Sequence, residues 1–569
     1  MAVQEKTGAE ALVDIMIEEG VEYIFGLPGG SAIPLFDALV GRNIKLVLTR
    51  HEQGAVHMAD GYARATGKTG VALVTSGPGA TNTVTGLFTA LMDSIPLVVV
   101  TGQMPAWTLG LDAFQEADVS GITYPCVKHS YLVKDVDDIP RIMREAFFLA
   151  SSGRPGPVLI DMPKNVSGAR ISPKADTMQL PGYSVPKAAQ DAEVARAATL
   201  LAAAKRPLLL VGHGAAISGA ATEVRALAET LQAPVVNTLL GKGVLPETHE
   251  LNLGMLGMHG TAYANKAIID CDLIMSIGSR WDDRIVSKYD EFCVNAVKIH
   301  IDIDAAEINK VVKVDLGIVG DAKTVLRQLL PRLVKGDTAD WVRQTKRWRR
   351  DFPLKFQKEG KLRAQQVIQE LYRLTGGKAI VTTDVGQHQM WAAQFILSES
   401  GRDWISSGGA GTMGFGLPSA IGAQLGRPGE TVVAIVGDGG FQMTLSELAT
   451  LFNLKIPVKI LVINNHYLGM VRQWQNLFYD NRYSGVDLEG NPDFVKLAGA
   501  YGIKGFRISR SADVRRVLKA ALDHPGPALI DAEVEQHDNV FPMIPAGAAH
   551  KDMLLGPPRR VLEKPTGGT

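Results

Sequence analysis

The stretch that decides the fold reads TVVAIVGDGGFQMTLSELATLFNLKIPVKILVINN and covers residues 431–465. It begins with an apolar run, 431–436, and ends with a second one, 458–463. Runs that are apolar on both faces are typical of parallel strands covered by helices on either side. Between them, 444–454 predicts a helix with Thr444 as its N-cap and Glu447 completing a capping box. The stretch therefore predicts a strand–helix–strand unit with Asp438 and Asn465 at the carboxyl ends of its strands.

Asp438 and Asn465 bring two oxygen-bearing side chains to neighbouring strand ends. A carboxylate and an amide oxygen are hard ligands suited to Mg²⁺, with phosphate oxygens and water completing the octahedron. Asp and Asn are also common in turns, where their side chains hydrogen-bond to nearby backbone. From these residues alone both interpretations stay open: a site for a cation and a phosphate, or a turn pair.

The same rhythm of apolar runs and helix-like segments extends over most of the chain, and it predicts a doubly wound α/β fold that is repeated. The other runs expected to form strands are 44–48, 70–75, 96–102, 157–162, 207–212, 234–238, 272–278, 297–304, 378–384 and 527–534.

Two stretches break this rhythm and are interpreted as linkers. Residues 169–189 are rich in Pro and polar residues, and residues 336–360 are highly charged. The basic run within the second, 343–352, is interpreted as a solvated helix face. The linkers divide the chain into domains at 1–168, 190–335 and 361–535, followed by a tail, 536–569, that is expected to lie over a surface or fray.

Composition excludes several classes of function. The 569 residues carry a formal net charge of zero, so we expect neither nucleic acid nor an anionic membrane as partner. Cys126, Cys271 and Cys293 are far apart, which argues against a disulfide framework or a thiolate zinc site. Residues 1–21 read as an amphipathic helix rather than a signal peptide, and no apolar stretch of about 20 residues predicts a membrane span. A cytoplasmic location is expected.

Glycine-rich loops follow several predicted strands, as in GLPGGS (26–31), TSGPGATN (75–82), GHGAAISGA (212–220) and SGGAGTMGFGLP (407–418). Gly409, Gly411 and Gly414 match the pattern GxGxxG. However, the preceding DWISS (403–407) is a poor strand, and no acid suited to a ribose follows about 20 residues later. A dinucleotide fingerprint is therefore disfavoured, and a loop that admits another ligand is preferred.

The order GDG (437–439) then NN (464–465) resembles the diphosphate-binding motif of thiamine-diphosphate enzymes, and RHEQGAVHMADGYARATGK (50–68) resembles their glutamate-bearing segment. The chain is most similar to the catalytic subunits of the acetohydroxyacid synthase (acetolactate synthase) family. The segments that carry this resemblance are 26–39, 112–119, 254–265, 280–284, 300–308, 386–394, 411–423 and 468–475.

The resemblance implies a pyrimidine-binding, an FAD-binding and a diphosphate-binding domain, with thiamine diphosphate, Mg²⁺ and FAD as cofactors. It implies a homodimer or tetramer with active sites between subunits, and it leaves open a separate regulatory small subunit. The implied reaction decarboxylates pyruvate and joins the two-carbon unit to a second 2-keto acid. With pyruvate as the acceptor the product is 2-acetolactate. With 2-oxobutyrate as the acceptor it is 2-aceto-2-hydroxybutyrate. Both products lie on the route to branched-chain amino acids.

By the same resemblance, Glu52 protonates the aminopyrimidine so that the cofactor's own amino group becomes the local base, a task that suits a desolvated carboxyl. Asp438, Asn465 and the backbone carbonyl of Tyr467 hold Mg²⁺. Met413 is the apolar wedge that bends the cofactor. The remaining positions that match contacts to thiamine diphosphate are Val385, Gly386, Gln387, His388, Gly411, Gly437, Gly439, Gly440, Leu468, Gly469 and Met470.

Substrate-facing positions follow in the same way. Gln115 and the backbone of Gly29 or Gly30 match groups near the reacting centre; simple loop geometry is the alternative for the glycines. Lys164 matches a lysine at the site entrance, with a plain surface lysine as the alternative.

Arg284 matches the residue that binds the second substrate's carboxylate. Trp474 matches a tryptophan that favours 2-oxobutyrate, with core packing as the alternative. The positions that match FAD contacts are Arg154, Met258, His259, Gly260, Thr261, Gly278, Arg280, Asp302, Ile303 and Asp321. Because the net reaction is not a redox reaction, the flavin would be structural or a relic.

Two other functions remain. One is a different thiamine-diphosphate enzyme, such as a 2-keto acid decarboxylase, a pyruvate oxidase or glyoxylate carboligase, although the last lacks a counterpart of Glu52. The other is a non-catalytic flavin- or nucleotide-binding protein that kept the scaffold, which the presence of Glu52, Asp438 and Asn465 disfavours.

Overall fold

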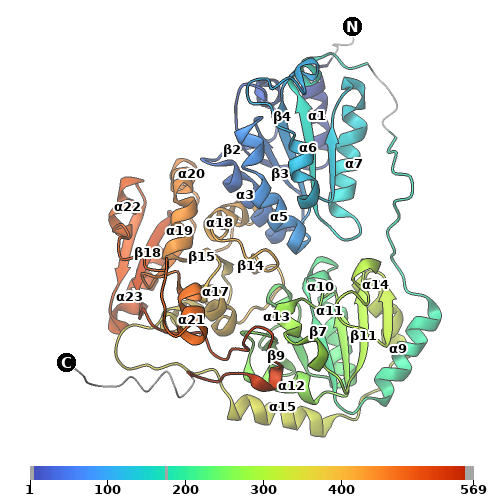
Figure 1. The fold of residues 1–569 in the computed structure, drawn as a ribbon, viewed down its shortest axis with the longest axis vertical. Coiled ribbons are helices and arrows are strands. Elements are labelled where there is room, and N and C mark those ends of the chain that lie inside the picture. The colour runs from blue at the N-terminus through green and yellow to red at the C-terminus, as the bar shows by residue number, and fades with distance from the viewer. Residues whose placement is uncertain (1–5, 173–176, 558–569) are drawn as a thin grey trace.

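Three six-stranded sheets, each covered by helices on both faces, make up the computed structural model, which describes residues 6–172 and 177–557 (Figure 1). Neighbouring strands pair in parallel in all three sheets. The prediction of a repeated, doubly wound α/β fold is therefore confirmed.

The first sheet is covered by α1 (Gly8–Glu18) and α7 (Ile139–Ser151) on one face and by α3 (Glu52–Thr66) and α5 (Val84–Asp93) on the other. The strand order reverses between β1 and β3, where ligands bind in open α/β sheets. In spatial order its strands are β2 (Lys45–Leu48), β1 (Tyr23–Leu27), β3 (Gly70–Val74), β4 (Leu97–Gln103), β6 (Pro157–Pro163) and β5 (His129–Leu132).

The second sheet has its reversal between β10 and β7. Helices α9 (Asp191–Ala203), α11 (Ala221–Leu231) and α14 (Ala322–Leu329) cover one face, and α12 (Ala262–Asp270), α13 (Asp283–Val286) and α15 (Ala339–Asp351) cover the other. Its strands are β12 (Leu316–Val319), β11 (Val297–Asp302), β10 (Leu273–Ile277), β7 (Pro207–Val211), β8 (Val235–Asn237) and β9 (Asn252–Met255).

The third sheet contains the strand–helix–strand unit and reverses between β13 and β15. Helices α16 (Ala364–Thr375), α17 (Gln387–Phe395) and α23 (Val514–Asp523) cover one face, and α18 (Gly416–Gly426), α20 (Leu448–Leu454) and α22 (Phe494–Ala500) cover the other. Its strands are β14 (Trp404–Ser406), β13 (Ile380–Thr383), β15 (Val432–Gly437), β16 (Lys459–Asn464), β18 (Ala528–Glu533) and β17 (Lys504–Ile508).

One hydrophobic core joins the first and third sheets, because α3 packs directly on α18. The helices approach so closely that a methyl group on Gly61 would overlap the backbone of Ser419, and one on Gly422 would overlap the backbone of Met58. Glycine is needed at both positions for this approach. Helix α3 of the first domain is thus fixed to the third domain of the same chain.

Two expectations about local structure were wrong. DWISS contains a strand, β14, at the edge of the third sheet. The helix after Gly437 begins at Asp438 as α19 (Asp438–Thr444) and continues through a 3₁₀ turn into α20, so Thr444 and Glu447 form no capping box. Instead the Thr444 hydroxyl donates to the carbonyl of Gly414, and the Glu447 carboxylate accepts from the amides of Arg50 and His51, the two residues before α3.

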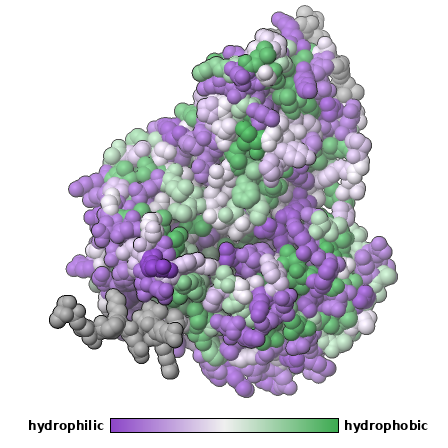
Figure 2. All heavy atoms as spheres, in the orientation of Figure 1, coloured by the Kyte–Doolittle hydropathy of each residue, from purple (hydrophilic) through white to green (hydrophobic). Residues whose placement is uncertain are grey.

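The segments between the sheets contact the second domain. Helix α15 lies in the segment expected to be a linker, and Trp341 on it donates its Nε1–H to the carbonyl of Pro207 at 3.0 Å. The tail crosses to the same domain, where the amide of Ile544 donates to the carbonyl of Met258 at 2.8 Å; its residues 558–569 lie outside the described part. Hydrophilic and hydrophobic residues are mixed over the face in Figure 2. No helix among the described residues is long and apolar enough to cross a membrane.

Candidate active site

Three helices begin at one pocket at the carboxyl edge of the third sheet. They are α17, α19 and α21 (Gly469–Phe478), and within the described chain no side chain caps their first turns. The free N–H groups and the positive ends of the helix dipoles make such a place suited to an anion. Neither Gly439 nor Gly440 has room for a side chain, because a methyl group on Gly439 would meet the side chain of Leu468 and one on Gly440 would meet the carboxylate of Asp384. The pocket fits a diphosphate.

The two residues of the opening stretch line this pocket together with Tyr467. Asn465 Oδ1 accepts from the amide of Tyr467 at 3.2 Å, so Asn465 does form the turn that was considered as an alternative. That oxygen keeps a second lone pair for a cation. Asp438 Oδ2 accepts from Asn491 Nδ2 at 2.7 Å. Burial raises the pKa of Asp438 to about 6, and a bound cation would favour its charged form.

A Mg²⁺ site here has one carboxylate, one amide oxygen and one backbone carbonyl to use. The described residues contain no group of three or more His, Cys, Asp or Glu that could hold a metal ion. This donor set is too poor for an all-protein cage, and it suits Mg²⁺, which is usually completed by water and substrate phosphates. The residues therefore fit a cation that is shared with a diphosphate.

Two further side chains of α17 shape the pocket. The His388 ring lies against Gly437, and burial lowers its pKa to about 3, so the imidazole is neutral. Its Nε2 is buried and has no hydrogen-bond partner in the described part of the chain, which leaves it for a ligand. Gln387 Oε1 accepts from Asn465 Nδ2 at 3.3 Å and links α17 to the end of β16.

Asp384 was not among the predicted residues, yet it organises the loop that carries Met413. Its carboxylate accepts from the amides of Val385, Gly414 and Gly416 at 2.8–3.2 Å. Burial raises its pKa to about 6. Asp384 ends a predicted strand, as Asp438 does, so the same sequence signal could have found it. Asn491, in the loop before α22, carries no such signal.

A cavity of about 920 Å³ runs from this pocket to the carboxyl ends of β7, β10 and β11 in the second domain. Val385, Gly386, Met413, Met470 and Val471 line both the pocket and the cavity. The far end lies at the reversal point of the second sheet, next to the loops after β7 and β10. The cavity thus offers an elongated ligand a path between the two domains.

Most of the residues predicted to contact FAD line this cavity: Arg154, Met258, His259, Gly278, Arg280, Asp302, Ile303 and Asp321. Burial lowers the pKa of His259 to about 3, and its Nε2 also has no partner within the described chain. These groups fit a polar cofactor. Gly260 and Thr261 lie behind the wall, where the Thr261 hydroxyl caps α12.

Arg284 and Trp474 lie on the cavity wall as well. Arg284 is held loosely, since its Nη1 contacts Met258 Sδ at 3.4 Å and its side chain is 58% exposed. A guanidinium on the wall of a mostly apolar cavity can bind a carboxylate, and the indole supplies apolar surface.

The predicted residues of the first domain gather elsewhere, at the carboxyl edge of the first sheet. Glu52, the first residue of α3, is 7% exposed and accepts from Asn82 Nδ2 at 2.9 Å. The loop after β3 lies against the segments that carry Gly29 and Gln115. A methyl group on Gly29 would meet the side chain of Thr75, and one on Gly77 would meet the backbone of Gln115. The exposed residues Gly30 and Lys164 follow β1 and β6 at the same edge.

Within one chain the two sets of predicted residues do not line a common space. Among the described residues, neither the diphosphate pocket nor the large cavity is lined by Glu52, Gln115, Lys164, Gly29 or Gly30. The two sets therefore lie at the edges of two different sheets of the chain.

Comparisons with known proteins agree with this geometry. Three family models match consecutive parts of the chain: "Thiamine pyrophosphate enzyme, N-terminal TPP binding domain" over residues 6–122, its "central domain" over 194–329, and its "C-terminal TPP binding domain" over 384–532. Thiamine pyrophosphate is another name for thiamine diphosphate.

Curated relatives match almost end to end. The chain is 48% identical to an acetolactate synthase large subunit of Parasynechococcus marenigrum, over 97% of this chain and 91% of that one. It is 46% identical to that of Lactococcus lactis, over 97% and 96%, and 45% identical to that of Pyropia yezoensis, over 98% and 97%. The chain therefore belongs to the acetolactate synthase large-subunit family of thiamine-diphosphate enzymes.

Proposed function

We propose that this chain catalyses the acetolactate synthase reaction at a site built from the diphosphate pocket, the adjoining cavity and, from a second copy of the chain, the carboxyl edge of the first sheet with Glu52. Pyruvate is decarboxylated, and its two-carbon unit is joined to pyruvate or to 2-oxobutyrate. The observation that carries the proposal is the continuity of the pocket with a cavity whose wall includes Arg284 and Trp474.

Thiamine diphosphate, when bound, supplies a nucleophilic carbon and an electron sink. The pocket residues would bind and orient it: the first turns of α17, α19 and α21 would receive the diphosphate, and His388 Nε2, which has no partner within the described chain, lies in the same pocket. Asp438, Asn465 and the carbonyl of Tyr467 would hold Mg²⁺ against the same group. Met413, on the wall shared with the cavity, would support the cofactor between its two rings.

Glu52 is the group that would exchange a proton with the aminopyrimidine. Its carboxyl is nearly buried, its Oε2 is held by Asn82, and Gly79 leaves space beside its Oε1. A fixed, desolvated carboxyl can share a proton with a ring nitrogen. Gln115 and the backbone at Gly29 and Gly30 would donate hydrogen bonds to developing charge, and Lys164 would attract anionic substrates at the entrance.

The cavity serves the second substrate and, we propose, FAD. Arg284 would bind the carboxylate of the acceptor, and Trp474 would bury the extra methyl group of 2-oxobutyrate. FAD would occupy the second-domain end beside Arg154, His259 and Asp321. A dimer is the smallest assembly that completes the site, and a tetramer or a regulatory subunit would add to it. The three cysteines are free, which supports a cytoplasmic location.

The test is an incubation of the purified protein with pyruvate, thiamine diphosphate, Mg²⁺ and FAD, followed by product analysis. We expect acetolactate. Acetaldehyde or acetyl phosphate as the main product would contradict the carboligase function, and a protein that binds the cofactors without turnover would favour a non-catalytic role. Leaving out FAD while measuring thiamine diphosphate binding tests whether the flavin is structural.

A further inference from the structure

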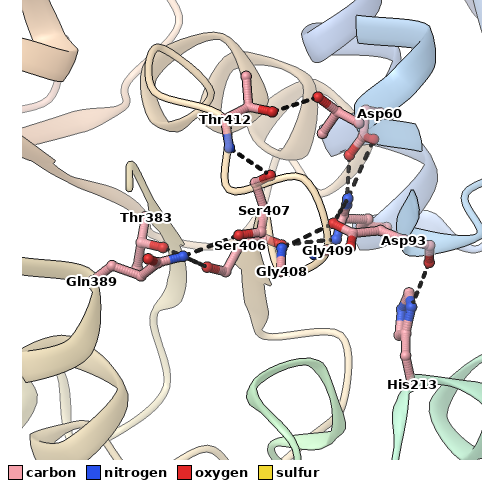
Figure 3. Close-up of polar contacts among 12 residues, drawn as sticks. Asp60, Asp93, His213, Thr383, Gln389, Ser406, Ser407, Gly408, Gly409 and Thr412 are labelled. Carbon is pink, nitrogen blue, oxygen red and sulfur yellow. Dashed lines mark hydrogen bonds and ion pairs between the residues drawn. The ribbon is translucent and has the colours of Figure 1, made fainter. Parts of the chain in front are cut away.

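Helix α5 of the first domain carries two polar side chains on one face, Thr89 and Asp93, four residues apart. Both are buried, and both hydrogen-bond to residues 408–412 of the third domain. Figure 3 shows Asp93 beside Gly408 and Gly409. Asp93 Oδ1 accepts from the amide of Gly409 at 2.6 Å, and its Oδ2 accepts from the amide of Gly408 at 3.0 Å. One carboxylate therefore holds two successive backbone groups.

The second contact has a defined direction. The hydroxyl of Thr89 donates to the carbonyl of Thr85 at 2.8 Å, which uses its only hydrogen. At the 2.7 Å contact between the two hydroxyls, Thr412 must therefore be the donor. The amide of Thr412 in turn donates to Ser407 Oγ at 3.0 Å.

The segment held in this way leads directly to Met413. Gly411 and Gly414 have φ values of +65° and +91°, so the loop turns sharply on either side of Thr412 and Met413. Asp384 fixes the far end through Gly414 and Gly416. The near end depends on α5, which belongs to another domain.

Asp93 is itself fixed in place. Its Oδ2 pairs with Arg64 Nη2 at 2.8 Å, and Arg64 also pairs with Asp60, at 2.5 Å from Nε to Oδ1. The His213 ring of the second domain contacts the carbonyl of Asp93 at 2.8 Å, so all three domains meet here. Burial alone would lower the pKa of Arg64, but the two carboxylates outweigh it and keep the guanidinium charged.

We propose that Asp93 and Thr89 are positioning residues for thiamine diphosphate: from α5 they hold residues 408–412 and thereby fix the position of Met413. This rests on the proposed role of the pocket and deepens it. The first domain would then contribute to two cofactor sites. Through α5 it would shape the site on the third domain of its own chain, and through Glu52 it would act in the site of the second copy.

The matched variants are Asp93→Asn, Thr89→Val and the control Asp60→Asn. Asp93→Asn keeps the shape but turns one acceptor into an NH₂ group that faces N–H donors. Thr89→Val keeps the shape and removes the acceptor of Thr412. Asp60→Asn removes a buried carboxylate from the same arginine and leaves the contacts to Gly408, Gly409 and Thr412 intact.

The dissociation constant of thiamine diphosphate is measured by titration in excess Mg²⁺ without substrate, beside the thermal unfolding midpoint of the cofactor-free protein. We expect Asp93→Asn to raise the dissociation constant about 10-fold and Thr89→Val about 3-fold, while Asp60→Asn stays within about 2-fold of the parent. Asp93→Asn and Asp60→Asn should lower the unfolding midpoint to a similar degree.

An unchanged dissociation constant in Thr89→Val, or equal weakening by Asp60→Asn and Asp93→Asn, would overturn the positioning role and leave a structural one. If Asp93→Asn does not fold, the comparison of Thr89→Val with Asp60→Asn decides alone. A parent protein that does not bind thiamine diphosphate would instead contradict the proposed function.

Discussion

Glu447 connects the third domain to the start of α3, and its replacement by Gln tests whether this contact places Glu52. The carboxylate accepts from the amides of Arg50 and His51 at 3.0–3.1 Å and from the Thr450 hydroxyl at 2.8 Å. Glu52 is the next residue along the chain. A methyl group on Gly54 would meet the same carboxylate, so the helix end lies directly on it.

The size of the effect follows from these bonds. Hydrogen bonds to a charged group contribute about 1.5–3 kcal/mol, against about 0.5–1.5 for neutral pairs, so losing the charge costs about 1 kcal/mol per bond. Burial raises the pKa of Glu447, which means that its charge is itself penalised, and Gln removes that penalty. Because burial outweighs these bonds in setting the pKa, the remaining loss comes from the Gln NH₂ group that would face the amides of Arg50 and His51, and the unfolding free energy should fall by about 1–2 kcal/mol.

The catalytic effect should exceed this stability change, because a shift of about 1 Å in a reacting group can cost about 100-fold in rate. For Glu447→Gln we expect kcat for acetolactate to fall about 10-fold or more, with the thiamine diphosphate dissociation constant unchanged. Thr450→Val is the control, since it leaves the carboxylate on α3 in place, and its kcat should stay within about 2-fold of the parent. Parental kcat and parental stability in Glu447→Gln would refute the reasoning.

Three other outcomes are expected. Gly422→Ala should destabilise the α3–α18 contact by about 1–3 kcal/mol in urea unfolding, because its methyl group overlaps the Met58 backbone, whereas Gly429→Ala, with open space around it, should change little. Burial raises the pKa of Asp161 to about 7, so the stability that its neutral form contributes is complete below about pH 4 and is lost as the pH rises through 7. The unfolding free energy of Asp161→Asn relative to the parent should therefore rise by up to about 4 kcal/mol between these limits. Parallel pH profiles of the two proteins would contradict this. Trp474→Leu should lower the preference for 2-oxobutyrate over pyruvate about 10-fold in a competition assay, and an unchanged product ratio would argue for packing alone.

Much of the fold could be predicted because strands buried on both faces are apolar throughout. The strands that the patterns missed show the limit of this signal: β5, β9, β12, β14 and β17 are all edge strands, and only β1 is internal. Edge strands are short or partly exposed and lack a continuous apolar run.

The same division holds for the site. Asp438 and Asn465 could be predicted because each follows a strand that the sequence reveals, and Asp384 shares that signal. The contacts of Glu447 and Asp93 could not be predicted, because their partners are far away in the sequence. Arg50 lies 397 residues from Glu447, and Gly408 lies 315 residues from Asp93. Thr444 and Glu447 look like a local capping box, yet both side chains bond to distant segments, so tertiary contacts override the local pattern.

The most direct test of a site shared between two chains is complementation between Glu52→Gln and Asp438→Ala. Each variant alone should be nearly inactive. In a mixed dimer, one site carries both substitutions and the other carries neither, so an equal mixture after subunit exchange should regain about one quarter of the parental acetolactate synthase activity. If the mixture stays as inactive as the separate variants while exchange is shown to occur, Glu52 and Asp438 act within one chain, and the account is wrong.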